Sequence, residues 1–207
     1  MRNTMIALLI VVAASMTGCF SASVDADYNA DASKLLSGHP KIPATAALII
    51  SDEQRDRKDS ASKLGIKVSV KTGDSLVGIN KAAVGQAFEN VVLGDSVGPR
   101  TDADIQLEPK VTDVITQVHG IGIIVHVTAI AKFELTAFDK DANQIWTKES
   151  DGKFESPSMF GLKMLAQRNQ VARDVYESFL PGWKEIYDDF YASQEVMSYL
   201  SGIGKAP

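Results

Sequence analysis

The single cysteine of this chain, Cys19, is the residue whose type and position most clearly suggest chemistry. One thiol allows no disulfide within the chain and excludes zinc sites built from two or four cysteines. The cysteine follows an apolar run at residues 5–14, with Arg2 ahead of it. As a helix this run would rise only about 15 Å, short of the ~30 Å hydrocarbon core of a bilayer. We therefore predict a signal peptide over residues 1–18 and not a transmembrane anchor.

The tetrapeptide Met16-Thr17-Gly18-Cys19 resembles the lipobox of bacterial lipoproteins, with Met16 in place of the usual leucine. The resemblance implies cleavage before Cys19 and attachment of a diacylglycerol and an N-acyl chain such as palmitate. At about 0.8 kcal/mol per buried methylene, three acyl chains would hold the chain on a membrane. Phe20, where aspartate would favour retention, implies sorting to the outer membrane. The alternative is an ordinary secretory signal followed by an unrelated cysteine.

Motifs of enzymes and of metal sites are absent or incomplete in the sequence. It lacks a G-x-S-x-G nucleophile elbow, a Walker-type phosphate loop, H-E-x-x-H and a dinucleotide fingerprint. Two acidic stretches, at residues 25–31 and 139–143, lack the glycine and the glutamate of a calcium loop. His39 lies in a polar segment. His119 and His126 are seven positions apart, which on one continuous strand puts them on opposite faces unless the glycines between them permit a bulge. We expect no catalytic residue, no metal and no cofactor.

An aromatic stripe marks the C-terminal part of the chain. Its members are Tyr176, Phe179, Trp183, Tyr187 and Phe190. Steps of three, four, four and three place these rings on one face of a helix, provided that Pro181-Gly182 interrupts it only mildly. Two interpretations are open. The rings could pack against a sheet, or they could form a partner-binding or membrane-surface face, where Trp and Tyr are common.

Hydrophobic patterns indicate the elements that would position these residues. Residues 45–50 form an apolar run that fits a buried strand, and residues 66–70 alternate apolar and polar side chains like a half-buried strand. The polar, charged stretch at residues 51–62 between them predicts a surface loop. Asp74 or Ser75 could cap a helix over residues 76–93.

The middle of the chain predicts a long hairpin. A strand at residues 103–118 contains Pro109, so we expect it to be bulged or at a sheet edge. After a reversal at Gly120 and Gly122, every odd-numbered position from 123 to 137 is apolar. The stretch at residues 139–143 has turn composition, and residues 144–154 return as the partner strand.

The pattern as a whole predicts an α+β fold with a mostly antiparallel sheet, a long hairpin and helices packed on one face. Helices are expected at residues 158–180 and 183–200, separated by the Pro-Gly pair. The expected organisation is a signal peptide at 1–18, a lipidated cysteine and flexible tether at 19–43, one periplasm-facing domain at 44–200 and a frayed tail at 201–207.

Composition and charge narrow the class of protein. The 207 residues include 26 acidic and 21 basic ones, giving a net charge of −5, and 45% are hydrophobic. This is ordinary globular composition. The acidic balance argues against a nucleic-acid partner, because such proteins normally carry a basic surplus or patch.

Several features together resemble a group of small outer-membrane accessory lipoproteins of Gram-negative bacteria, of the YajG-like, LptE-like or CsgG/PelC-like sort. They are the lipobox, the short tether, the segments AALII and FENVV, and the strand DADIQLEPKV. The resemblance spans about residues 44–180. It implies a non-enzymatic partner of envelope machinery.

Three functions follow as hypotheses. The first is a non-enzymatic outer-membrane lipoprotein, held by the lipid on Cys19, that supports the assembly of an envelope or secretion machine and could self-associate. The second is a lipid- or glycan-binding module, which predicts a pocket lined by the odd-numbered residues of 123–137. The third is an envelope hydrolase, which predicts a cleft with clustered titratable groups of perturbed pKa.

Overall fold

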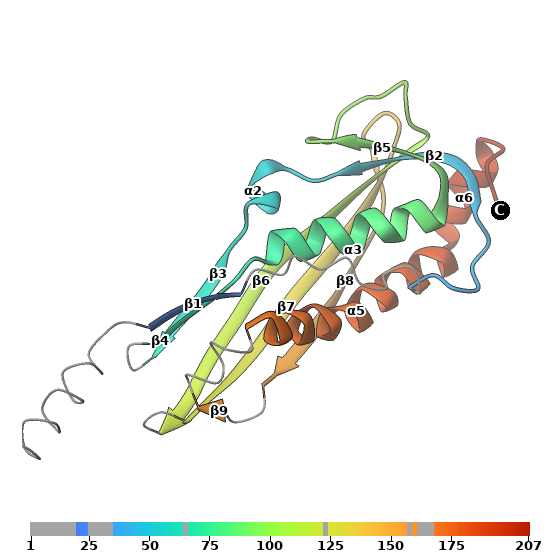
Figure 1. Ribbon diagram of the computed structural model, residues 1–207. Coiled ribbons are helices and arrows are strands. Elements are labelled where there is room, and N and C mark those ends of the chain that lie inside the picture. Colours follow the sequence, from blue (N-terminus) through green and yellow to red (C-terminus); the bar gives the residue numbers. More distant parts are fainter. Residues whose placement is uncertain (1–19, 25–34, 64–65, 122–123, 157–158, 161–167) are drawn as a thin grey trace, which may run out of the picture.

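The computed structural model describes residues 20–24, 35–63, 66–121, 124–156, 159–160 and 168–207. A mixed sheet in the strand order β5-β2-β6-β7-β8 is covered on one face by two helices (Figure 1). The strands are β2 Ile42–Ile49, β5 Phe88–Gly94, β6 Ile105–Ile121, β7 Ile124–Asp139 and β8 Gln144–Glu155. The covering helices are α3 Thr72–Ala87 and α5 Arg168–Ala192. The α+β class predicted from the sequence is confirmed.

The long hairpin is the central feature of the sheet. β6 and β7 pair antiparallel from Ile105↔Asp139 to Ile121↔Ile124, and β8 continues the antiparallel order beyond β7. The register shifts between Val111 and Asp113, so the expected bulge near Pro109 is present. The strands at the other edge of the sheet are parallel, because β2 pairs parallel with both β5 and β6. The sheet is therefore mixed, and its antiparallel part is the hairpin with β8.

The helix expected at residues 76–93 is wrong in its last part. α3 ends at Ala87, and Phe88–Gly94 forms β5, which pairs parallel with β2 through Val91↔Ala46 and Val92↔Ala47. Valine is β-branched and favours strands, since its side chain is restricted in a helix and packs well on a pleated surface. The apolar spacing of this segment fits either structure, and the pairing with β2 decides it.

The helix break expected at Pro181-Gly182 is also wrong. Pro181 lies inside α5, which runs without interruption from Arg168 to Ala192. A proline in a helix costs about 3 kcal/mol, whereas each large apolar side chain that becomes buried contributes about 1.5–3 kcal/mol. Buried rings on both sides of Pro181 outweigh that cost. In the part of the expected 158–180 helix that the structure describes, Met159–Phe160 forms the short strand β9, paired with β7, and residues 168–180 belong to α5.

The chain turns after α5 into a shorter C-terminal helix. Ser193 caps α6, Gln194–Gly202, by accepting a hydrogen bond from the backbone N–H of Val196. The Tyr199 hydroxyl donates to the carbonyl of Asp104 at 2.6 Å and so ties α6 to the start of the hairpin. The first residues of the expected tail at 201–207, Ser201 and Gly202, belong to the last turn of α6.

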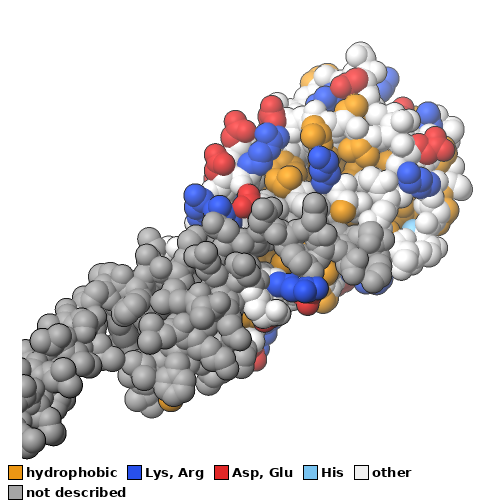
Figure 2. All heavy atoms as spheres, viewed as in Figure 1, with side chains coloured by type: hydrophobic (Ala, Val, Ile, Leu, Met, Phe, Trp, Pro, Cys, Tyr) orange, Lys and Arg blue, Asp and Glu red, His pale blue; other side chains and the backbone are white. Residues whose placement is uncertain are grey.

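A second, small sheet lies at one end of the molecule (Figure 1). In it β1 Phe20–Val24 pairs parallel with β4 Ile66–Val70, and β4 pairs antiparallel with β3 Asp59–Lys63. A short helix, α2 Asp52–Arg55, precedes β3, and acidic and basic side chains are intermingled over it (Figure 2). The loop expected at residues 51–62 is thus replaced in part by α2 and β3.

The range 19–43 is not one uniform tether. Its first described residues form β1, Leu35 and Leu36 are buried in the core, and β2 begins at Ile42. The ring of His39 stacks on Tyr191 with centroids 4.3 Å apart. These apolar and aromatic contacts attach the segment to the domain.

Candidate functional site

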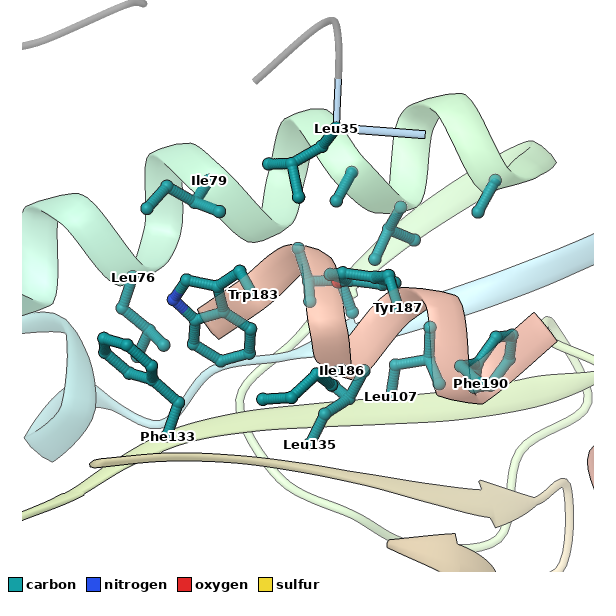
Figure 3. Packing of buried hydrophobic residues seen from close by; sticks show 14 of the residues in the cluster. Leu35, Leu76, Ile79, Leu107, Phe133, Leu135, Trp183, Ile186, Tyr187 and Phe190 are labelled. Atoms are coloured by element: carbon teal, nitrogen blue, oxygen red, sulfur yellow. The ribbon is translucent and has the colours of Figure 1, made fainter. Parts of the chain in front are cut away.

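The aromatic stripe is part of the hydrophobic core. Its side chains are between 0% and 2% exposed, and Figure 3 shows Trp183, Tyr187 and Phe190 of α5 between α3 and the sheet. Phe133 of β7 contacts two of them, with its ring centroid 5.3 Å from that of Phe179 and 4.9 Å from that of Trp183. All five residues named from the sequence are buried in this way: Tyr176, Phe179, Trp183, Tyr187 and Phe190.

The packing interpretation of the stripe therefore holds, and the partner-binding interpretation does not fit this fold. A binding face needs exposed rings, and these rings instead cover the odd-numbered side chains of β7. Those side chains are buried from Val127 to Ala137. The space in which the ligand-binding hypothesis places a pocket is filled by the protein's own aromatic groups.

One hydrogen bond crosses this core. Tyr187 of α5 donates through its hydroxyl to Oδ1 of Asn80 on α3 at 2.8 Å, and both residues are fully buried. The Asn80 amide in turn donates to the Leu76 carbonyl at 2.9 Å. Burial raises the pKa of Tyr187, because the phenolate would lose its hydration. The pair thus connects the two covering helices without offering an ionisable group at neutral pH.

A shallow groove follows the outer side of α5 beside β8. It is lined by Lys148, Pro181, Lys184, Glu185, Asp188, Asp189 and Ala192. Lys148 lies 3.5 Å from Asp189, and Lys184 lies 2.6 Å from Asp188. Although partial burial acts to raise it, hydrogen bonds from Lys184 and His39 hold the pKa of the Asp188 carboxyl below its usual value. The carboxylates of Asp188 and Asp189 thus form ion pairs with lysine and histidine side chains, and these pairs have a structural role.

The second acidic stretch forms a turn between β7 and β8. The Asp139 carboxylate accepts hydrogen bonds from the backbone N–H groups of Asp141 and Asn143 at 2.9 and 2.8 Å. It also accepts one from the Asn143 amide at 2.9 Å. Desolvation opposes them, but these bonds lower the pKa of Asp139. Local donors therefore occupy its oxygens, as expected for a turn. The other stretch, residues 25–31, lies outside the described residues.

The two histidines expected on opposite faces share one face. His119 on β6 pairs directly with His126 on β7, and their ring centroids are 6.3 Å apart. Partners across a hairpin with a two-residue turn always differ by an odd number of positions, so the parity argument for one continuous strand does not apply. His119 contacts Gln117 at 3.1 Å and His126 contacts Thr128 at 3.4 Å.

These histidines belong to an outward-facing surface that sequence reasoning missed. Because side chains alternate along strands and cross-strand partners share a face, seven of the residues whose side chains are described line the side of the hairpin away from the helices. This hairpin face comprises Ile115, Gln117, His119, Ile124, His126, Thr128 and Ile130. Ile115 is 42% exposed and Ile124 is 46% exposed. The sequence signal that could have revealed this surface is the absence of Asp, Glu, Lys and Arg from residues 114–131.

A second exposed feature is the edge strand β5. In the described sheet β5 has a neighbour only on the β2 side, so its other edge is unpaired there. Leu93 on this strand is 58% exposed. Unpaired N–H and C=O groups on such an edge can bind another strand.

Cys19 lies outside the described residues, and the strand β1 begins at the next residue, Phe20. Among the residues that are described, no group of three His, Cys, Asp or Glu side chains is arranged to hold a metal. None of the helices in that part of the chain combines the length and the apolarity needed to cross a bilayer.

No family model and no curated protein matches this sequence. Among solved structures, a Xanthomonas campestris protein assigned to the family DUF330 is 13% identical, with a TM-score of 0.48, over 84% of this chain and 98% of its own. A Helicobacter pylori homologue of a neuraminyllactose-binding hemagglutinin is 9% identical, with a TM-score of 0.42, over 88% and 98%. A Neisseria meningitidis lipoprotein is 14% identical, with a TM-score of 0.34, over 63% and 99%.

The structural matches thus include a bacterial lipoprotein. TM-scores below 0.5 are too low to assign a function by structural similarity. The resemblance to YajG-like, LptE-like or CsgG/PelC-like proteins stays a prediction.

Proposed function

We propose that this chain is a non-enzymatic outer-membrane lipoprotein, anchored by Cys19 and facing the periplasm, that serves as a structural or assembly partner of envelope machinery. The observation that carries the proposal is the filled interior. The aromatic rings of α5 occupy the space between the sheet and the helices, with the Phe133 and Trp183 rings 4.9 Å apart. Binding would therefore use the surface of the domain.

The ligand-binding alternative has less support. A lipid or glycan held between sheet and helices would have to displace side chains such as Trp183 and Tyr187, which are 1% and 0% exposed. Opening a cavity of that size would cost several kcal/mol, of the order found for aromatic-to-alanine changes in cores. The hydrolase alternative needs clustered acid and base groups with separated pKa values. The carboxylates of the α5 groove are instead matched by lysines.

The edge of β5 is the surface that best suits an assembly partner. Its sequence, FENVVLG, contains two valines and a single charged residue, Glu89, and Leu93 projects into solvent. An extended segment of another protein, or of a second copy of this chain, could add to this edge through backbone hydrogen bonds.

The anchor is tested by the Cys19→Ala variant expressed in a Gram-negative host. We expect loss of incorporated labelled palmitate and release of the protein from membranes. A Phe20→Asp variant is the matched control for sorting, because it keeps the acceptor cysteine; we expect it to retain palmitate and to move to the inner membrane. Full membrane retention of Cys19→Ala would contradict the anchor.

The assembly role is tested by a photo-crosslinking amino acid placed at Leu93 in the lipidated protein in cells. We expect a discrete higher-mass product, identified by mass spectrometry as an envelope protein or as a dimer of this chain. The same amino acid at Ile203, which directly follows α6 and is 39% exposed, is the control site. Equal, diffuse crosslinking at both sites would contradict a specific partner at the β5 edge.

A further inference from the structure

The hairpin face lies at the same end of the molecule as the proposed anchor. β1 begins at Phe20, which pairs with Ile66 at the start of β4, and Ile66 in turn pairs with Lys63 at the end of β3. Figure 1 shows this end of the small sheet and the end of the β6–β7 hairpin directed to one side, away from the C-terminus. Acyl chains on Cys19 would therefore place the hairpin end close to the membrane.

The outward side of the sheet changes character along the hairpin. Over the body of the domain it carries charged cross-strand partners, such as Lys110↔Glu134 and Asp113↔Lys132. Lys132 in turn pairs with Asp151 of β8. Beyond the pair Asp113–Lys132, both strands of the hairpin are free of Asp, Glu, Lys and Arg.

The neighbouring strand β8 carries charge further along this surface than the hairpin itself does. β8 ends with Lys153 opposite Ile130 and Glu155 opposite Thr128, and these two charges form their own ion pair at 2.6 Å. Past that level β7 is joined by β9, which consists of Met159 and Phe160. Apart from this Lys153–Glu155 pair on β8, the outward surface of the hairpin beyond Asp113–Lys132 has exposed isoleucines and no formal charge, whereas the solvated face of an antiparallel sheet is normally polar.

The charge at the anchor end favours an acidic membrane surface. Lys67 of β4 pairs with Ser21 of β1, and Lys63 of β3 pairs with Ile66, which is the β4 partner of Phe20. Residues 60–71 contain three lysines and no acidic residue, although the whole chain has a net charge of −5. Basic residues near a bilayer are attracted to anionic headgroups by about 1 kcal/mol each.

We propose that the hairpin face, Ile115 and Ile124 above all, rests in the interfacial region of an anionic phospholipid bilayer beside the acyl chains of Cys19. The inference rests on the proposed lipid anchor and adds an orientation to it. The domain is seated on the membrane by its β1 and hairpin end, and the opposite end, with α6, faces away from it.

The test uses the single-cysteine composition of the chain. Acylation occupies the sulfur of Cys19, so an Ile124→Cys substitution provides the one reactive thiol for an environment-sensitive nitrobenzoxadiazole label. The labelled, full-length lipidated protein is reconstituted on vesicles of phosphatidylethanolamine and phosphatidylglycerol. Quenching by lipids that carry a nitroxide on the acyl chain reports contact with the bilayer. Ile115→Cys is a second probe on the same face, and Leu93→Cys on β5 is the control.

We expect a blue-shifted emission and loss of most of the fluorescence to nitroxide lipids at positions 124 and 115, with little change at position 93. Water-like emission at 124 and 115, in protein that floats with the vesicles, would overturn the seating and leave the anchor intact. A blue shift without lipid quenching would also overturn it, since protein would then cover the face. Labelling of Cys19 itself, with no flotation, would instead refute the lipid anchor.

Discussion

The hydroxyl of Tyr187 on α5 donates a 2.8 Å hydrogen bond to Oδ1 of Asn80 on α3, and no surface of either residue is exposed to solvent. The bond joins residues 107 positions apart in the chain. It is a buried polar contact within a cluster that is otherwise apolar. A buried acceptor left without its donor costs free energy, so this pair fixes how the two covering helices meet.

Removing the donor should destabilise the fold. In a Tyr187→Phe variant the buried Asn80 Oδ1 loses the tyrosine hydroxyl, and we expect the free energy of unfolding to fall by about 1–3 kcal/mol. Urea denaturation monitored by circular dichroism measures the change. Tyr191→Phe is the control, because the hydroxyl of Tyr191 lies nearer the surface and donates to the Pro40 carbonyl at 3.2 Å. Equal losses in the two variants would contradict a special role for the buried pair.

Stability should decrease at alkaline pH. Burial raises the pKa of Tyr187 and raises the pKa of Tyr191 to about 12. Tyrosine in an unfolded chain titrates near pH ~10. Above that pH the unfolded state loses protons that the native state keeps, so the stabilisation is complete below about pH 10 and declines as the pH rises. Urea titrations from about pH 8 to 11 should show this decline, and a Tyr187→Phe/Tyr191→Phe variant should show a shallower one.

Replacing each of two helical glycines by alanine should change the stability of the protein in opposite directions. A Cβ at Gly182 would lie 2.5 Å from the carbonyl oxygen of Asp151, so Gly182→Ala should force α5 away from β8 and cost about 1–3 kcal/mol. A Cβ at Gly85 on α3 would meet nothing within 4 Å. Gly85→Ala should therefore stabilise the protein by about 0.5–1 kcal/mol, through helix propensity. Thermal unfolding of both variants provides the comparison, and a stabilised Gly182→Ala would refute the close approach.

Because the aromatic stripe is packed in the core, truncating one of its side chains should greatly lower the free energy of unfolding. Trp183→Ala removes a side chain that is 1% exposed and packs on Phe133, and we expect a loss of about 3–5 kcal/mol. Leu93→Ala, at a 58% exposed position on β5, should change stability by less than about 0.5 kcal/mol. A Trp183→Ala variant with unchanged denaturation midpoint would mean that the ring is not part of the core.

Local sequence patterns predicted those elements whose characteristic pattern lies entirely within one short stretch of the chain. The alternation in residues 123–137 gave β7 and the face that it buries, and the composition of residues 139–143 gave the turn that Asp139 stabilises. The aromatic spacing predicted one helical face. It did not decide between core and surface, because a stripe has the same spacing in either place.

Long-range contacts decided the rest. Residues 88–93 fit a helix or a strand locally, and parallel pairing with β2 made them β5. Pro181 is a helix breaker by propensity, yet buried rings on both sides kept α5 continuous. The hairpin face and the pairing of His119 with His126 depend on where the chain reverses.

The sequence by itself determined the class of fold and the long hairpin. Only the tertiary structure decided that the aromatic stripe is interior and that the uncharged hairpin face is exterior. The physical reason is that burial is a property of what packs against a residue. Residue types and spacing describe the side chain, whereas its environment is supplied by segments far away in the chain.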